Sequence, residues 1–464
     1  MAYSKLWEEL MKAKSIYGIK YPSIFDPEAV SFAGKHIGRS KYETYMQGSD
    51  FSKTKNLKWK HIAGAENIGG ITYPPAFDIK NADFSQRDIS KSDFSYLDEV
   101  LDWHMIKHAA EIWGIRYPKN FGMNGIDLTG KYIAGSDFSN VRNLTWSHFE
   151  GVWGLNDICY PRGFDMENAI LSDKNISGSD FSRLQSLEWD QISAAEFIFG
   201  IKYPKNFDIE NADFNEDPYG KPRDLTGSDF SMCNQLTWEQ MKFAGDISGI
   251  VYPENFEINL ADFRGRDISR SDFSRVMNLK WEHIDVAEDA SGLIYPESFE
   301  INTMKAFGKN LSGNNFSRVA NLKWRHIKDA RYIAGIVYPS DFDAEEADFR
   351  DLDIRFSDFS RVKNLKWEHI SVAGKDLRGI KYPSGFDFSG ADLAGREIEG
   401  SDFRHVRGLE WEQLVEQHGW KKVFGVKKSL KDIVFPACFD DSKVSLDGMD
   451  ISYCDFTALD ECVL

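Results

Sequence analysis

One tryptophan recurs at a nearly constant spacing along almost the whole chain. It stands at Trp7, Trp59, Trp103, Trp146, Trp189, Trp238, Trp281, Trp324, Trp367 and Trp411. Most neighbouring pairs are 43 or 44 residues apart, and the two longer gaps, of 52 and 49 residues, indicate insertions. A fixed period of this length is typical of a solenoid, in which each unit packs only on its neighbours. We therefore expect about ten repeated units.

A Tyr-Pro pair follows most of these tryptophans after 14 residues, as at Tyr73-Pro74 and Tyr252-Pro253. The last unit stretches this gap to reach Phe435-Pro436, which is the kind of departure expected of a terminal repeat. The sequence therefore predicts a single elongated domain over 1–464. It would contain an atypical N-terminal unit (1–52), regular units (53–410) and a degenerate C-terminal capping unit (411–464).

A five-residue rhythm fills the stretch between each Tyr-Pro pair and the next tryptophan. Residues 82–86 (ADFSQ), 87–91 (RDISK) and 92–96 (SDFSY) show it clearly. This pattern resembles the pentapeptide-repeat family and is similar to the β-helical regions of bacterial secreted effectors. The resemblance implies a right-handed β-helix in which four five-residue steps make one square coil. The expected fold is a repeat solenoid of this type, an α/β solenoid with a short α-helix in each unit of about 43 residues.

The remaining part of each unit is predicted to hold the helix and a short returning strand. Over residues 278–287, Asn278 is a candidate N-cap, and Trp281, Ile284 and Ala287 fall three apart on one face. A strand is expected at 336–338. Helices pack about 8–10 Å apart whereas strand coils stack about 4.8 Å apart, so each unit should supply two coils. Ten such units would form a rod about 100 Å long.

The charge of the chain limits its partners. It has 73 acidic and 56 basic residues, a net charge of −17. Nucleic acids and anionic membranes require a cationic face, so we expect no direct binding to either. No stretch approaches the roughly 18 apolar residues of a membrane span. A basic protein partner is favoured.

Five cysteines, at positions 159, 233, 438, 454 and 462, form no CxxC pair. We interpret them as free thiols in a reducing compartment. The first ten residues carry charges where a secretory signal needs an apolar stretch. The expected location is therefore a cytoplasm, either bacterial or that of a host cell if the protein is delivered as an effector.

Catalytic motifs are missing from the sequence. No P-loop, GxSxG, HExxH or Rossmann glycine motif occurs. A reactive thiol at Cys438, Cys454 or Cys462 is one alternative, although no activating base recurs nearby. We therefore expect a protein that is not an enzyme and has no catalytic, metal or cofactor site.

A histidine column stands two residues after most of the tryptophans. It comprises His61, His104, His148, His283, His326 and His369, with Gln191, Gln240 and Gln413 at the same position in other units. A metal ligand could not be exchanged so freely for an amide, whereas a hydrogen-bonding group could. We therefore interpret the column as structural. The tryptophans and tyrosines are interpreted as core, with an aromatic carbohydrate groove as the alternative.

A basic ladder occupies a position at which the five-residue pattern expects a small inward residue. It comprises Arg87, Lys131, Lys174, Arg223, Arg266, Lys309 and Arg396, and Leu352 interrupts it. Unpaired inward charge is costly. Either each cation meets an aspartate such as Asp88, or the ladder lines a groove for an acidic ligand.

An acidic column is expected to point outward. It comprises Asp93, Asp137, Asp180, Asp229, Asp272, Asp358 and Asp402. Regularly spaced acids resemble those of pentapeptide-repeat proteins that imitate DNA and occupy topoisomerases. Arginines three residues later, as at Arg183 and Arg275, would neutralise part of this charge. This gives an alternative function, an acidic DNA-mimic that binds a DNA-handling enzyme.

The two insertions are candidate partner-binding loops, since loops on rigid scaffolds often carry specificity. Their named candidates are Lys41, Tyr42 and Tyr45 in the first loop and Asp217, Tyr219 and Lys221 in the second. Deleting 216–222 is predicted to leave melting unchanged and to weaken partner binding. The leading hypothesis is a non-catalytic protein–protein interaction scaffold, as in a bacterial effector or adaptor. The identity of the partner and the oligomeric state are left open.

Overall fold

The computed structural model describes residues 4–39, 47–98, 101–119, 121–415, 429–438 and 441–462. The chain forms two compact units. Unit 1 comprises Met1–Phe121, Asp348–Ser360 and Leu365–Leu464, and unit 2 comprises Gly122–Ala347 and Arg361–Asn364. The first and last repeats belong to the same unit.

Both units are stacks of coils with short sides and a turn at each corner. Neighbouring coils are joined by isolated parallel bridges, and the described residues form no longer strand. One column of bridged residues in unit 2 runs Asp229, Val251, Asp272, Ile294, Asn315 and Val337. Its members are 21 or 22 residues apart, so the prediction of two coils per unit is confirmed. The strand predicted at 336–338 is wrong, because the flanking turns leave only Val337 to pair.

A short helix contains or begins at each repeated tryptophan. The α-helices are α1 (Ser4–Leu10), α2 (Trp59–Ile62), α3 (Trp103–Ile106), α4 (Trp189–Ile192), α5 (Trp281–Ile284), α6 (Trp324–Ile327), α7 (Trp367–Ser371) and α8 (Trp411–Val415), and two units have 3₁₀ turns instead, η3 (Trp146–Phe149) and η5 (Trp238–Gln240). The helix predicted over 278–287 is therefore too long. Asn278 has a φ of 60°, in the left-handed region, and Lys280 is the N-cap of α5.

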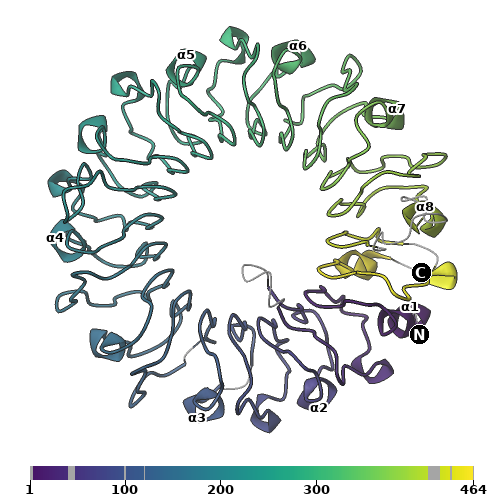
Figure 1. Cartoon of the computed structure of the whole chain (residues 1–464), viewed down its shortest axis with the longest axis horizontal. Coiled ribbons are helices and arrows are strands. Elements are labelled where there is room, and N and C mark those ends of the chain that lie inside the picture. Colours follow the sequence, from purple (N-terminus) through teal and green to yellow (C-terminus); the bar gives the residue numbers. More distant parts are fainter. Residues whose placement is uncertain are drawn as a thin grey trace. The chain divides into compact units, whose positions relative to one another are not determined.

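Further 3₁₀ turns follow several of the Tyr-Pro pairs. They are η1 (Pro27–Ala29), η2 (Ile79–Asn81), η4 (Ile209–Asn211), η6 (Ile258–Leu260) and η7 (Ile301–Thr303), and the C-terminal part adds η8 (Asp441–Lys443) and η9 (Thr457–Glu461). The first residue of each of η1, η2, η4, η6 and η7 is buried. In Figure 1 the tryptophan helices of each unit lie along one side of its coils.

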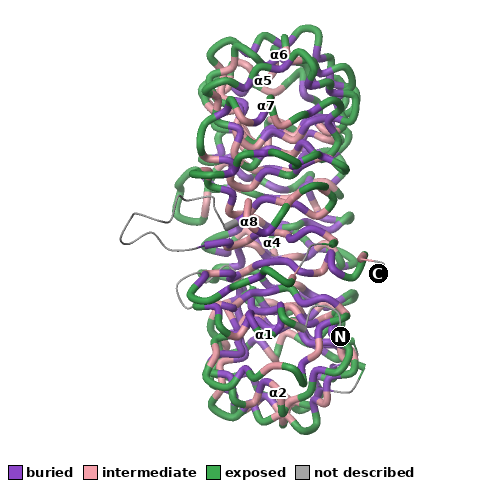
Figure 2. The backbone as a smooth tube through the Cα atoms, turned by 90° about the vertical axis from the view of Figure 1, so that its right-hand side faces the viewer, coloured by how far each residue is buried: buried purple, intermediate pink, exposed green. Residues whose placement is uncertain are grey.

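The core of each coil is an aromatic stack. Tyr252 of a Tyr-Pro pair lies against Phe273 of the next coil with ring centroids 4.7 Å apart and planes 9° apart. Tyr203 stacks on Phe230 in the same way. Small serines such as Ser271 complete the interior and are fully buried. Figure 2 shows buried and exposed residues alternating along every coil, as the five-residue rhythm predicts.

The first and last coils of the chain are hydrogen-bonded to each other within unit 1. The N–H of Lys20 donates to the carbonyl of Cys454 at 2.9 Å, and the N–H of Phe456 donates back to Lys20 at 3.1 Å. Asp460 of η9 accepts from the N–H and the hydroxyl of Ser23. Figure 1 shows both termini at this junction. The edges of the first and last coils are therefore paired with each other; unpaired edges invite association.

The interpretation of all five cysteines as free thiols is also wrong. Cys438 and Cys462 form a disulfide, with their Cα atoms 5.3 Å apart. The pair lies 24 residues apart in sequence, a spacing close to one coil, and stacking brings the two side chains together. Cys159, Cys233 and Cys454 are free.

Candidate functional site

The histidine column caps the starts of the tryptophan helices. Nδ1 of His283 accepts the N–H of Lys280 at 3.1 Å, and Oε1 of Gln191 accepts that of Glu188 at 2.8 Å. The same bond is made by His61, His148, His326, His369, Gln240 and Gln413. Histidine and glutamine both provide an acceptor for an N–H that the helix leaves unpaired, which is why they interchange. The structural interpretation is confirmed.

His104 is the exception in this column. In its unit the side chain of Asp102 caps the helix by accepting the N–H of His104 at 2.7 Å. Within the described parts of the chain, no three His, Cys, Asp or Glu side chains are grouped in a way that could hold a metal ion.

The basic ladder binds main-chain carbonyl groups. Nη1 of Arg266 donates to Lys242 at 2.9 Å and Nη2 donates to Ala244 at 2.7 Å. The other cations bonded in this way are Arg87, to Ala63 and Ala65; Arg223, to Ser193 and Glu216; Lys309, to Asp285; and Arg396, to Ser371 and Gly374. Most of these carbonyls follow the preceding tryptophan helix, where a helix leaves its acceptors unpaired.

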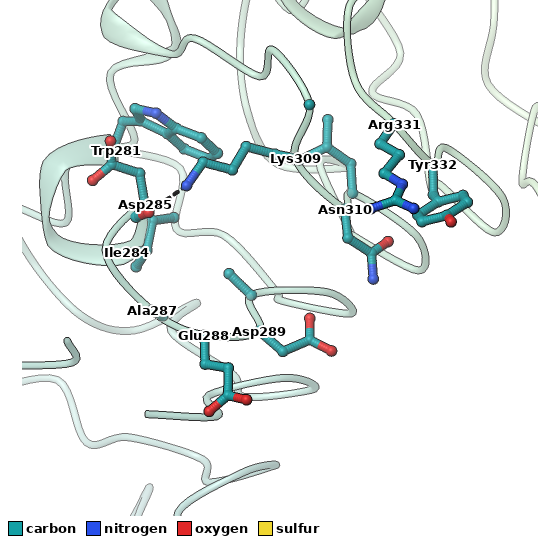
Figure 3. Close-up of a pocket in the computed structure, with 13 residues that line it drawn as sticks. Trp281, Ile284, Asp285, Ala287, Glu288, Asp289, Lys309, Asn310, Arg331 and Tyr332 are labelled. Atoms are coloured by element: carbon teal, nitrogen blue, oxygen red, sulfur yellow. Dashed lines mark hydrogen bonds between the residues drawn. The ribbon is translucent and has the colours of Figure 1, made fainter. Parts of the chain in front are cut away.

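The same cations lie against the tryptophan of the preceding unit. The guanidinium of Arg223 is 5.2 Å from the centroid of the Trp189 ring, and those of Arg396 and Arg87 are 5.7 and 6.0 Å from Trp367 and Trp59. Figure 3 shows the lysine version, in which Lys309 reaches the carbonyl of Asp285 beside the ring of Trp281. These contacts satisfy the inward charge in a way that neither sequence interpretation described.

Lys131 is half-buried like most of the ladder, whereas Lys174 is exposed. Lys174 is the exposed member of the ladder, since the other six are buried or half-buried.

The acidic column caps turns. Each carboxylate accepts the N–H of the residue two positions later, as Asp93 does from Ser95 at 2.9 Å. Asp137, Asp180, Asp229, Asp272, Asp358 and Asp402 make the same bond. The side chains of Asp93, Asp358 and Asp180 are only 9%, 17% and 22% exposed. These three carboxylates are therefore largely covered by the turns and the neighbouring side chains.

Several of these acids form ion pairs with neighbouring cations. Nζ of Lys381 lies 3.1 Å from Asp358. Burial alone would raise the pKa of Asp358, but hydrogen bonds from Ser360 and the ion pair with Lys381 hold that pKa below its ordinary value. Arg116 and Lys202 lie beside Asp93 and Asp180 in the same way.

Two of the free thiols, Cys233 and Cys454, are poor nucleophiles. Cys454 is fully buried, and burial raises its pKa well above the ordinary value. Burial also raises the pKa of Cys233 to about 12. The alternative of a reactive thiol at Cys438, Cys454 or Cys462 is therefore wrong for all three, since the other two are joined in a disulfide.

The second insertion is a small hairpin on unit 2. Glu216 and Pro222 form an antiparallel bridge, and the carboxylate of Asp217 accepts the N–H groups of Tyr219 and Lys221. Tyr219 is 59% exposed, and its hydroxyl donates to Asp173 of an earlier coil at 2.8 Å. Lys41, Tyr42 and Tyr45, the candidates of the first insertion, lie outside the described residues.

An aromatic face on unit 2 adjoins this hairpin, and sequence reasoning missed it. It comprises Tyr132, Trp153, Ile170, Phe197 and Tyr219, which are 46%, 69%, 70%, 43% and 59% exposed. Tyr132 and Trp153 are joined by a parallel bridge between neighbouring coils. The equivalent bridge in another repeat of unit 2 joins two acids, Asp267 and Asp289. The signal available in the sequence was Tyr132. It follows Lys131 at the position where the other units place Asp, Asn or Glu after the ladder cation.

A cleft of about 470 Å³ lies within the aromatic face. Trp146, Phe149 and Val152 line one side, and Ile170, Asp173, Lys174 and Glu196 line the rest. Tyr219 is tied to the rim through its bond to Asp173. Among the repeated tryptophans, Trp7, Trp189, Trp281 and Trp411 are buried in the core and the other six are half-buried. None is exposed, which argues against the aromatic groove predicted as the alternative.

No protein-family model matches the chain. No curated protein matches it either. None of the helices in the described part of the chain is long and apolar enough to span a bilayer.

Several solved structures do match. A trypsin-treated variant of QnrB1, a plasmid-mediated fluoroquinolone resistance protein, is 13% identical, with 59% of this chain and 83% of that one covered and a TM-score of 0.10. HetL, a pentapeptide repeat protein involved in heterocyst differentiation regulation from the cyanobacterium Nostoc sp. strain PCC 7120, is 10% identical, with 77% and 94% covered and a TM-score of 0.10. A second QnrB1 variant is 13% identical, with 62% and 82% covered and a TM-score of 0.09. With TM-scores of 0.10 and below, these likenesses carry no argument about the fold or the partners of this chain.

Proposed function

We propose that this chain is a non-catalytic scaffold that binds a protein partner through the aromatic face of unit 2. The observation that carries the proposal is the exposure of Trp153 and Ile170, at 69% and 70%, on neighbouring coils beside a cleft. Large apolar side chains gathered on a soluble surface mark interaction sites. Aromatic residues are also the ones that most often dominate protein interfaces.

The surroundings of the face favour a basic partner. Glu150, Asp173 and Glu196 line the cleft beside a single cation, Lys174. The net charge of −17 adds a long-range attraction for basic proteins, which speeds association. The coils beneath the face are held by core stacks such as Tyr160 on Phe181, so little ordering is needed on binding.

Finer roles remain proposals. An adaptor or bacterial effector in a cytoplasm fits the scaffold function and the fold. The alternative is the acidic DNA-mimic that binds a DNA-handling enzyme. Its support is weaker than the sequence suggested, because Asp93, Asp180 and Asp358 cap turns and face lysine or arginine instead of forming a free acidic ribbon.

Photo-crosslinking tests the proposed face directly. A photoreactive amino acid is placed at Ile170, and in a matched variant at Leu260, which is 66% exposed on η6 of the same unit. We expect a discrete protein adduct from position 170 and none from position 260. Equal adducts from both positions, or adducts from neither, would contradict the proposal.

A further inference from the structure

The cleft beside Trp146 is a variant of a site that the molecule elsewhere fills with its own cation. We propose that this cleft receives an arginine or lysine side chain of the partner protein. The inference rests on the proposed scaffold function and assigns the chemistry that the aromatic face recognises.

The filled version of the cleft is seen at Trp281. It measures about 210 Å³ and is lined by Trp281, Ile284 and the following turn on one side and by Lys309 on the other. Lys309 crosses it to the carbonyl of Asp285 (Figure 3). Where the ladder residue is arginine, as at Arg223, the guanidinium also lies over the tryptophan ring. The repeat thus shows which group the site accepts, a cation with an apolar stem.

The cleft beside Trp146 lacks this filling. It is larger, about 470 Å³ against 210 Å³. Its ladder residue, Lys174, is exposed, unlike the other six members. The backbone after the helix also differs: Glu150, the C-cap of η3, is extended (φ −65°, ψ 123°), whereas Ser193, the C-cap of α4, is helical (φ −60°, ψ −30°). The altered turn and the outward lysine are associated with the wider opening.

The lining suits a cation that comes from outside. Glu150, Asp173 and Glu196 supply three carboxylates against one lysine. Trp146 and Phe149 supply aromatic surface, and Val152 and Ile170 supply apolar walls for a methylene stem. The hydroxyl of Tyr219 donates to Asp173 and so holds that carboxylate at the rim. A guanidinium suits both the carboxylates and the aromatic surface of this lining, because it pairs with carboxylates and stacks on aromatic rings.

The neighbouring residues define the rest of the partner segment. Trp153 and Phe197 stand exposed next to the cleft, so an apolar residue beside the cation would be buried with them. The occupant is therefore a protein segment that presents arginine or lysine next to an apolar side chain.

The test selects peptides that bind the chain and then asks whether a longer side chain at ladder position 174 blocks their binding. A random twelve-residue peptide library displayed on phage is selected on the full chain, and binders are then measured on three variants. Lys174→Arg supplies a longer-reaching guanidinium to fill the cleft. Lys309→Arg makes the same change in a cleft that is already filled. Trp153→Ala removes the apolar contact.

We expect clones with arginine or lysine beside an apolar residue. They should lose about tenfold in affinity on Lys174→Arg, the size expected for one charge-assisted contact, and should bind Lys309→Arg as they bind the original chain. Replacing the peptide cation by glutamine should have an equal effect. Clones that are weakened by Trp153→Ala but not by Lys174→Arg would overturn the cation site and leave the scaffold proposal standing. Clones that are indifferent to Trp153→Ala would overturn both. Circular dichroism confirms that each variant is folded.

Discussion

Arg266 donates a hydrogen bond of 2.7 Å from its guanidinium to the carbonyl oxygen of Ala244, which follows the tryptophan helix of the previous repeat. A second bond reaches Lys242. The cation thereby links two repeats at a point where the carbonyl groups that follow the helix have no main-chain partner. The same geometry explains why basic residues recur at an inward position and why the cleft at Trp146, without it, stands open.

Replacing Arg266 should loosen the stack. Arg266→Leu leaves two half-buried carbonyls without their partner and should lower the free energy of unfolding by about 1–3 kcal/mol. The measurement is urea denaturation followed by tryptophan fluorescence. The matched control is Arg264→Leu, two residues away, whose side chain is 76% exposed and pairs only with Asp262 on the surface. Equal effects of the two changes would contradict the role given to Arg266.

The histidine caps should make stability depend on pH. Burial lowers the pKa of His283 and of His326 below the ordinary value of 6.5. The unfolded chain then binds protons more readily than the folded one, so the contribution is complete above about pH 6.5 and is lost as pH falls through the lowered pKa. Protonation also removes the acceptor on Nδ1.

Glutamine substitution tests this directly, since Gln191 performs the same cap. The double variant His283→Gln, His326→Gln should match the original chain at pH 8 and melt at a higher temperature than it at pH 5.5. Thermal unfolding at the two pH values is the measurement. A double variant that is destabilised at pH 8 would show that the ring does more than accept one hydrogen bond.

The pairing of the first and last coils should be visible in hydrogen exchange. The amide of Ser23 donates to Asp460 at 2.8 Å, and the amide of Lys20 donates to Cys454. Asp460→Ala should therefore speed exchange at Ser23 while Lys20 stays protected. Asp447→Ala, at another exposed acid of the C-terminal part, should leave both amides unchanged. Rapid exchange at Lys20 in the original chain would contradict the pairing.

The deletion of the hairpin should cover fewer residues than the 216–222 predicted from the sequence. Arg223 is buried, and its Nε donates to the carbonyl of Glu216, so removing 216 would cost stability as well as binding. Replacing 217–221 with two glycines keeps that carbonyl. This variant should melt like the original chain and bind the selected peptides less well, because it loses Tyr219. Unchanged affinity would remove the hairpin from the binding site.

Much of the fold could be predicted because its causes are local and repeated. The spacing of Trp281 and Trp324 predicts the length of the repeated unit. The five-residue rhythm predicts that Phe273 and Ser271 point into the core, where both are buried. The pairing of Lys20 with Cys454 could not be predicted, because it joins residues at opposite ends of the sequence. The repeat pattern carries no signal for such a contact.

The candidate site was missed for a related reason. The sequence drew attention to residues that recur, such as Arg266 and His283, and these proved to be structural. The aromatic face consists of departures from the repeat, including Tyr132 and Trp153, which become neighbours only when the coils stack. In a solenoid the recurring residues build the scaffold, and the exceptions are the better guide to a binding site.

Affinity capture with matched variants tests the central claim most directly. Three proteins are used to capture partners from bacterial and eukaryotic lysates at low and high salt: the original chain, Trp153→Ala and Phe307→Ala. Phe307→Ala is the control, because it alters another apolar side chain of unit 2, one that is 83% exposed. Quantitative mass spectrometry compares what each retains. The account predicts a specific protein held by the original chain and by Phe307→Ala and lost from Trp153→Ala. A partner retained equally by all three, such as a DNA-binding enzyme released only by salt, would contradict binding through the aromatic face and favour the DNA-mimic.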